Sequence, residues 1–191
     1  MSYTADADPL CYPGTNILIN LLDIRDADLL DEAELAFFLA RAEEPFPEGG
    51  FDSAHYLALH RHLFQDVYSW AGHIRTIRTG KGGNWFCYPD YIGAELDRVF
   101  DLLGDPARSA AMTADEFADH AGHFLAELNA VHPFREGNGR TQLVFLAMLA
   151  DLAGFGFNEK QLEPDRVMHA MVRSFLGDED PLKALVRDIV G

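Results

Sequence analysis

Residues 113–153 read TADEFADHAGHFLAELNAV-HPFREGNGR-TQLVFLAMLADLA, so that two apolar helical patterns flank a polar segment. Thr113 followed by Glu116 has the spacing of a capping box, which begins a helix. Apolar residues then recur at intervals of three and four, at Phe117, Ala121, Phe124, Leu125 and Leu128. This pattern predicts a helix that buries one face and ends just before His132.

The second pattern begins near Gly139 or Arg140 and stops at Gly154, a typical helix-ending residue. Its apolar face is predicted at Val144, Ala147 and Met148. Residues 132–140 are therefore expected to form a loop between two helices.

The same helical periodicity extends over most of the chain. It predicts further helices at about 15–23, 27–43, 52–71, 90–103, 164–176 and 181–190. One segment departs from it, because Ile74–Arg78 alternates, residues 80–84 are rich in glycine, and residues 85–88 favour strands. We therefore predict an all-α fold with a small β-hairpin at about 74–88. No linker interrupts the sequence, so a single domain over residues 1–191 is expected.

The composition excludes several classes of function. Thirty-one acidic residues against 15 basic ones give a formal net charge of −16, which disfavours direct binding to nucleic acid or to an anionic membrane. No apolar run approaches the ~18 residues of a membrane span, and the N-terminal residues lack the pattern of a secretory signal. A cytoplasmic location is the expectation.

The loop carries the residue types of a phosphate site. Gly137 and Gly139 flank Asn138 at the start of a helix, where free N–H groups and the positive end of the helix dipole favour an anion. Asn138 can add an amide, and Arg140 a guanidinium suited to phosphate oxygens. Glu136 would repel a bare polyphosphate unless a cation such as Mg²⁺ bridged the two. His132 is the one base of neutral pH in the segment.

Each of these residues alone would more often belong to an ordinary turn. A dinucleotide-binding motif is excluded because Gly137–Gln142 lacks the third glycine and follows a helix. Gly80-Lys81 lacks the Ser or Thr of a P-loop. The joint occurrence of base, carboxylate, glycines and arginine is far more specific. Five of the basic residues gather in the hairpin and the loop, which predicts a local positive pocket: Arg75, Arg78, Lys81, Arg135 and Arg140.

The loop resembles the signature of the Fic family, His-Pro-Phe-x-Asp/Glu-Gly-Asn-Gly-Arg-x-x-Arg, and matches it from His132 to Arg140. Residues 63–75 and the hairpin after them resemble the family's helix and flap. Residues 8–16 resemble the opening of its small bacterial toxin-type members. The resemblance thus covers most of the chain and implies a Fic-type helical core.

The resemblance implies protein adenylyltransfer from ATP. His132 would deprotonate a target hydroxyl, which attacks the α-phosphate and releases pyrophosphate. Glu136 would hold Mg²⁺, and the nucleotide phosphates would be bound by Gly137, Asn138, Gly139 and Arg140. Phe134 would anchor the loop in the core. The flap would pair with the target backbone as an added strand through Lys81, Gly82, Gly83 and Asn84.

Leu143 departs from the signature, which has a second arginine at this position. In the family that arginine binds the γ-phosphate and pairs with an inhibitory glutamate. Its replacement leaves open reduced or differently regulated AMP transfer, transfer of another phosphate-linked group, or a weakened module that binds a partner. Leu143 could also simply pack against the core.

No segment fits the family's inhibitory Ser/Thr-x-x-x-Glu-Gly/Asn helix; the nearest, residues 174–179, has Asp178 where the glutamate is required. The resemblance therefore implies a separate small antitoxin that supplies this helix. For the target protein it suggests a subunit of DNA gyrase or topoisomerase IV.

Overall fold

The computed structural model describes residues 4–5, 8–81 and 83–190, and its fold is all-α with a small sheet. The helices are α1 (Ala27–Ala42), α2 (Ser53–Phe64), α3 (Pro89–Leu103), α4 (Ala114–Val131), α5 (Asn138–Ala153), α6 (Pro164–Phe175) and α7 (Asp180–Ile189). Two short 3₁₀ helices lie at Pro106–Ala111 and Glu159–Gln161. The predicted fold class is confirmed. No helix among the described residues has the length and apolarity needed to cross a bilayer.

The predicted helix at 15–23 is wrong, because this segment is extended and looped. Cys11 and Leu18 form an isolated antiparallel bridge, and the side chain of Asn20 bonds to four nearby backbone groups. An asparagine that satisfies local backbone groups in this way competes with helix formation. The helix predicted at 52–71 also ends early, at Phe64.

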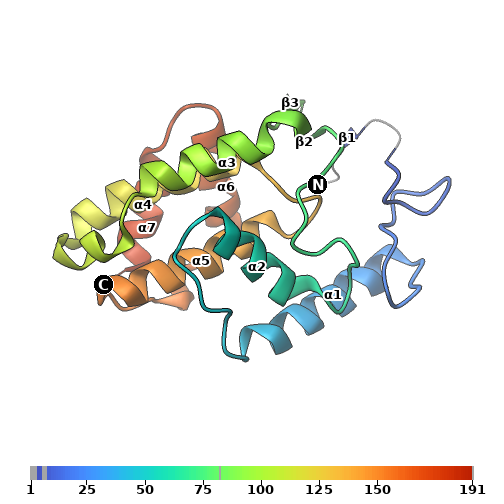
Figure 1. Cartoon of the computed structure of the whole chain (residues 1–191), viewed down its shortest axis with the longest axis horizontal. Helices are drawn as coiled ribbons and strands as arrows, with labels where there is room; N and C mark the ends of the chain where they lie inside the picture. Colours follow the sequence, from blue (N-terminus) through green and yellow to red (C-terminus); the bar gives the residue numbers. More distant parts are fainter. Residues whose placement is uncertain (1–3, 6–7, 82, 191) are drawn as a thin grey trace.

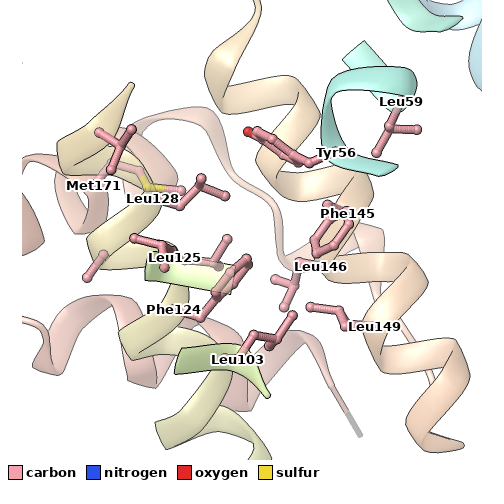
Figure 2. Close-up of a cluster of buried hydrophobic side chains, with 14 of the residues drawn as sticks. Tyr56, Leu59, Leu103, Phe124, Leu125, Leu128, Phe145, Leu146, Leu149 and Met171 are labelled. Carbon is pink, nitrogen blue, oxygen red and sulfur yellow. The ribbon is translucent and has the colours of Figure 1, made fainter. Parts of the chain in front are cut away.

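Helix α4 packs against α3, α5, α6 and α7, while α5 also packs against α2, which pairs with α1. In Figure 1, α1 and α2 lie at the end of the molecule away from α4 and α7. In Figure 2, Phe124 and Leu125 of α4 face Phe145 and Leu146 of α5, and Tyr56 of α2 closes the cluster. These side chains are almost fully buried. The two elements that flank the loop are therefore held in the main core.

The buried face of α5 differs from the predicted one. Val144, Ala147 and Met148 are only half-buried, whereas the positions beside them are fully buried: Phe145, Leu146, Leu149 and Ala150. The helix is apolar on nearly every side, so its periodicity does not define which face meets the core. The packing of Phe145 sets the buried face of α5, because its ring packs edge-on against the rings of Tyr56 and Phe100.

The start and end of α4 determine where the loop begins. The predicted capping box is present, since the Glu116 amide donates to Thr113 Oγ1 at 3.3 Å and the Thr113 amide donates to Glu116 Oε2 at 2.8 Å. The helix ends at His132, which adopts the left-handed conformation with φ 50° and ψ 63°. This conformation is uncommon for a residue with a Cβ, and it turns the chain sharply out of the helix.

The hairpin is shorter than predicted and lies within the predicted range of about 74–88. Strands β2 (Thr79–Lys81) and β3 (Asn84–Trp85) pair antiparallel, and Ile74–Arg78 belongs to neither strand. The segment is instead held by Arg75, whose backbone N–H donates to Pro133 O at 2.9 Å. An unpredicted strand, β1 (Thr4–Ala5), pairs with the other edge of β2 and gives the order β1-β2-β3.

Candidate active site

Buried side chains of the loop and of α2 hold residues 132–140 in place. Phe134 is fully buried, and its ring stacks on His60 of α2 with centroids 3.6 Å apart. The Asn138 amide is closed onto the Phe134 backbone, accepting from its N–H at 2.9 Å and donating to its carbonyl at 2.8 Å. His60 adds a ring nitrogen contact of 3.0 Å to the carbonyl of Glu136. The loop is therefore rigidly shaped before any ligand arrives.

These contacts change one expectation. The side chain of Asn138 was expected to reach a phosphate, but both ends of its amide already hold the loop together. Its remaining contribution to an anion is its backbone N–H at the first position of α5. The amide side chain therefore maintains the shape of the loop and is not available to bind the anion.

The first turn of α5 presents backbone donors to the loop. Gly137 is its N-cap, with φ +79°, and supplies no capping side chain. A Cβ on Gly137 would lie 2.5 Å from the ring of Phe64, so a side chain is excluded by space as well as by conformation. The amides of Asn138, Gly139 and Arg140 lie in this first turn, where helix geometry leaves N–H groups without intrahelical acceptors. They are free to bind an anion at the positive end of the helix.

His132 lies beside this helix start and is deeply buried. Its ring stacks on Phe86, with centroids 3.7 Å apart and planes 4° from parallel. Burial, together with the nearby charges of Arg75 and Lys81, lowers the pKa of His132 to about 3. The imidazole is therefore neutral at physiological pH, which is the form that accepts a proton.

Arg140 is held by an acidic residue that the sequence analysis did not identify. Its guanidinium forms an ion pair with Glu34 of α1, and it lies 4.0 Å from Glu136. Glu34 is buried, with 6% of its surface exposed, and Tyr68 hydrogen-bonds the same carboxylate. The ring of Phe64 lies under the guanidinium at 4.9 Å. One side of Arg140 is thus fixed, while its side chain keeps 29% of its surface exposed.

Glu136 is half-buried within the loop. Its carboxylate accepts from the Gly137 amide at 2.9 Å. Burial raises its pKa, and the neighbouring charge of Glu34 acts in the same direction. The described residues contain no group of three or more His, Cys, Asp or Glu side chains that could enclose a metal. A lone carboxylate fits Mg²⁺ only in the manner in which that ion binds with phosphates, through one protein ligand, phosphate oxygens and water.

The expected positive pocket is only partly formed. Arg75 is buried and donates to the carbonyls of His132, Ile77, Cys87 and Val131, so it ties the flap to the loop. Arg135 forms an ion pair with Asp8 at 2.6 Å, in which both side chains are 8% exposed. Arg78 lies over the rings of two aromatic residues in the flap. Arg140 and Lys81 remain near the loop opening.

A cavity of about 290 Å³ opens beside His132. One wall is apolar and comes from α6, with Val167, Met168, Met171 and Val172. The cavity is also lined by polar residues from three elements: Lys81 and Asn84 of the flap, Asn129 of α4, and Gln142 of α5. Gly139 also lines the cavity, so the start of α5 and the cavity form one continuous site.

The predicted flap residues are placed as follows. Lys81 ends β2, Gly83 has φ +84° in the turn, and Asn84 begins β3. Gly82 lies outside the described residues. Since β1 covers the outer edge of β2, the strand edge that continues from the cavity is that of β3.

Leu143 is half-buried, and it is not among the hydrophobic side chains of the described residues that pack against the main core. Core packing therefore does not explain why leucine replaces the expected arginine. The residues that the sequence analysis missed, Glu34, Asp8 and Gln142, come from distant segments or from a helix interior. Only Glu34 carried a signal, as an acidic residue one helical turn from the apolar side chains of Leu30 and Phe38.

In comparison with known proteins, the chain is similar to members of one protein family. The Fic/DOC family model matches residues 50–150. "Probable protein adenylyltransferase y4lH" of Sinorhizobium fredii is 56% identical over 98% of both chains. "Protein adenylyltransferase VbhT" of Bartonella schoenbuchensis is 35% identical over 97% of this chain and 39% of that protein. The crystal structure of the effector BepC from Bartonella tribocorum, with bound AMPPNP, is 27% identical, covers 95% of this chain and 96% of that one, and has a TM-score of 0.86.

Proposed function

Because this chain belongs to the Fic/DOC family and is an adenylyltransferase, we propose that it transfers AMP from ATP to a hydroxyl side chain of a target protein. One observation carries the proposal: a buried, neutral histidine lies directly before a helix start that is built to bind an anion. The bound AMPPNP in the BepC structure supports ATP as the donor.

The chemistry follows from the residues in place. The target hydroxyl approaches His132, whose neutral ring takes the proton as the oxygen attacks the α-phosphorus. The new O–P bond forms while the bond to the β-phosphate oxygen breaks, and pyrophosphate leaves. The backbone N–H groups at the start of α5 and the guanidinium of Arg140 stabilise the negative charge on the phosphates. The protein side of the reaction therefore consists of proton transfer and charge stabilisation.

The low pKa of His132 also fits this sequence of events. Burial is the main cause that disfavours the protonated ring, and the charges of Arg75 and Lys81 act in the same direction. A triphosphate bound beside the ring would place opposite charge there and raise the pKa toward neutrality. His132 would then become a stronger base only once the donor is in place, which disfavours proton uptake without substrate.

Mg²⁺ is expected to be held by Glu136 together with the phosphates. When bound, it would neutralise charge on the leaving pyrophosphate. The raised pKa of Glu136 means that its carboxylate is poorly compensated by its present surroundings, and a cation would compensate it. The hydrogen bond from the Gly137 amide orients the carboxylate within the loop.

The target is proposed to add a strand to the flap at β3. This edge adjoins the cavity through Asn84 and lies on the side that β1 does not cover. Main-chain pairing there would place a hydroxyl near His132 with little dependence on target side chains. A gyrase or topoisomerase IV subunit as target, and control by a small antitoxin, remain proposals from the family resemblance.

The test uses the protein with a bacterial lysate and ATP labelled at the α- or the γ-phosphate. We expect protein-bound label from α-labelled ATP alone. His132→Ala should abolish labelling and retain nucleotide binding, whereas His73→Ala, at an exposed histidine, should label as the parent does. Labelling that persists in His132→Ala would refute the mechanism.

Leu143 supports a second candidate, transfer of another phosphate-linked group. A leucine supplies no charge for a γ-phosphate, and a donor without that phosphate would not need one. Labelling only from a diphosphate-linked donor would favour this candidate, whereas label from γ-labelled ATP alone would point to phosphate transfer from ATP.

A further inference from the structure

The side-chain amide of Gln142 is buried and makes no hydrogen bond within the described part of the fold. The residue has no exposed surface, and neither Oε1 nor Nε2 has a hydrogen-bond partner among the described residues. It nevertheless lines the cavity beside His132. An unpaired buried amide is costly, and most buried polar side chains in proteins have a partner. A glutamine in this position therefore indicates a partner that enters the cavity.

The neighbouring amide does not share this property. Asn129 also lines the cavity, but its Nδ2 donates to the carbonyl of Met171 at 2.9 Å and thereby ties α4 to α6. Gln142 makes no such link. Its amide carries one donor group and one acceptor, and Gln142 shares the cavity lining with the apolar side chains of α6.

The place of Gln142 on α5 connects it to the phosphate site. Gly139 and Gln142 are three residues apart, on the same face of the helix, and both line the cavity. The helix rises ~4.5 Å over this interval. A nucleotide with phosphates at the helix start could thus place its base against the Gln142 amide, with the base plane against the side chains of Met168 and Val172.

We propose that Gln142 reads the base of the donor nucleotide, pairing its amide with the amino group and adjacent ring nitrogen of adenine. The inference rests on the proposed function, since it assumes an adenine nucleotide in the site. A carboxamide presents one donor and one acceptor side by side, and this edge of adenine presents the complementary pair. Gln142 is then a specificity-determining residue, distinct from the groups that bind phosphate.

The experiment compares ATP with purine riboside triphosphate, which lacks only the 6-amino group, by calorimetric titration in the presence of Mg²⁺. The parent protein should bind ATP about tenfold to a hundredfold more tightly than the analogue, the usual range for one buried hydrogen-bonded contact. In Gln142→Leu the two affinities should become equal within about twofold, mainly through weaker ATP binding. Gln161→Leu, at an exposed glutamine, should retain the parent preference.

Folding is checked separately by thermal unfolding. Leucine replaces an unpaired amide by an apolar group of similar size, so Gln142→Leu should be at least as stable as the parent. Gln142→Met provides a second apolar variant with the same expected loss of preference. An ATP preference that survives in both variants would overturn the inference and leave the proposed function intact. Failure of the parent protein to bind ATP at all would overturn both.

Discussion

His60 offers a measurable link between the buried core and the active-site loop. The Gly72 amide donates to its Nδ1 at 2.8 Å, so the proton of the neutral ring lies on Nε2, which donates to the Glu136 carbonyl at 3.0 Å. Burial is the main cause that lowers its pKa from 6.5 to about 3. Adding a proton at Nδ1 would break the bond to Gly72 inside the core. The replacement His60→Gln removes this titration.

The magnitude follows from proton linkage. Between pH 6.5 and 3 the unfolded chain binds a proton at His60 that the folded protein does not, so stability falls as the pH falls through this window. The loss is ~1.4 kcal/mol per pH unit, or ~2 kcal/mol between pH 7 and pH 5. His132, whose pKa is lowered to a similar value, adds a comparable loss that is retained in the variant. His60→Gln should therefore remove about half of the loss that His60 and His132 cause together.

The assay is urea unfolding at pH 7, 6 and 5, followed by tryptophan fluorescence. Absolute stability will fall in His60→Gln, since the ring that stacks on Phe134 is lost. The relevant quantity is therefore the change in unfolding free energy between pH 7 and 5, which should be ~2 kcal/mol smaller than in the parent. His73→Gln, at an exposed site, should leave it unchanged. Equal changes in the parent and His60→Gln would mean that His60 is not held neutral in the folded state.

Three further changes test the geometry of the loop. Gly137→Ala forces a Cβ against the Phe64 ring at positive φ, so it should lower the unfolding free energy by about 1–3 kcal/mol. The same variant should bind ATP more weakly in a titration, and unaltered binding would contradict a rigid loop. Glu34→Gln removes the charge that holds Arg140 and should cost about 1–3 kcal/mol in urea unfolding, whereas an unchanged midpoint would show that the ion pair does not stabilise the fold. Leu143→Arg should tighten ATP binding about tenfold to a hundredfold, and an unchanged dissociation constant would argue that the γ-phosphate is bound by other residues.

The sequence was sufficient for those features that depend on neighbouring residues. The capping box at Thr113, the glycine stop at Gly154 and the loop between α4 and α5 are local, because each is defined by groups a few residues apart. The family resemblance is equally local in its main motif, from His132 to Arg140. The helical class followed from the periodicity of apolar residues over most of the chain.

The tertiary structure decided everything that depends on residues distant in sequence. Glu34 meets Arg140 across 106 positions, and Asp8 meets Arg135 across 127. No local pattern can predict such pairs, because they exist only once the helices have packed. The same holds for the buried face of α5 and for the amide of Gln142, since a helix that is apolar all round leaves the choice of face to its neighbours. The loop could thus be recognised from the sequence, whereas the groups that hold it and the cavity beside it emerge only from packing.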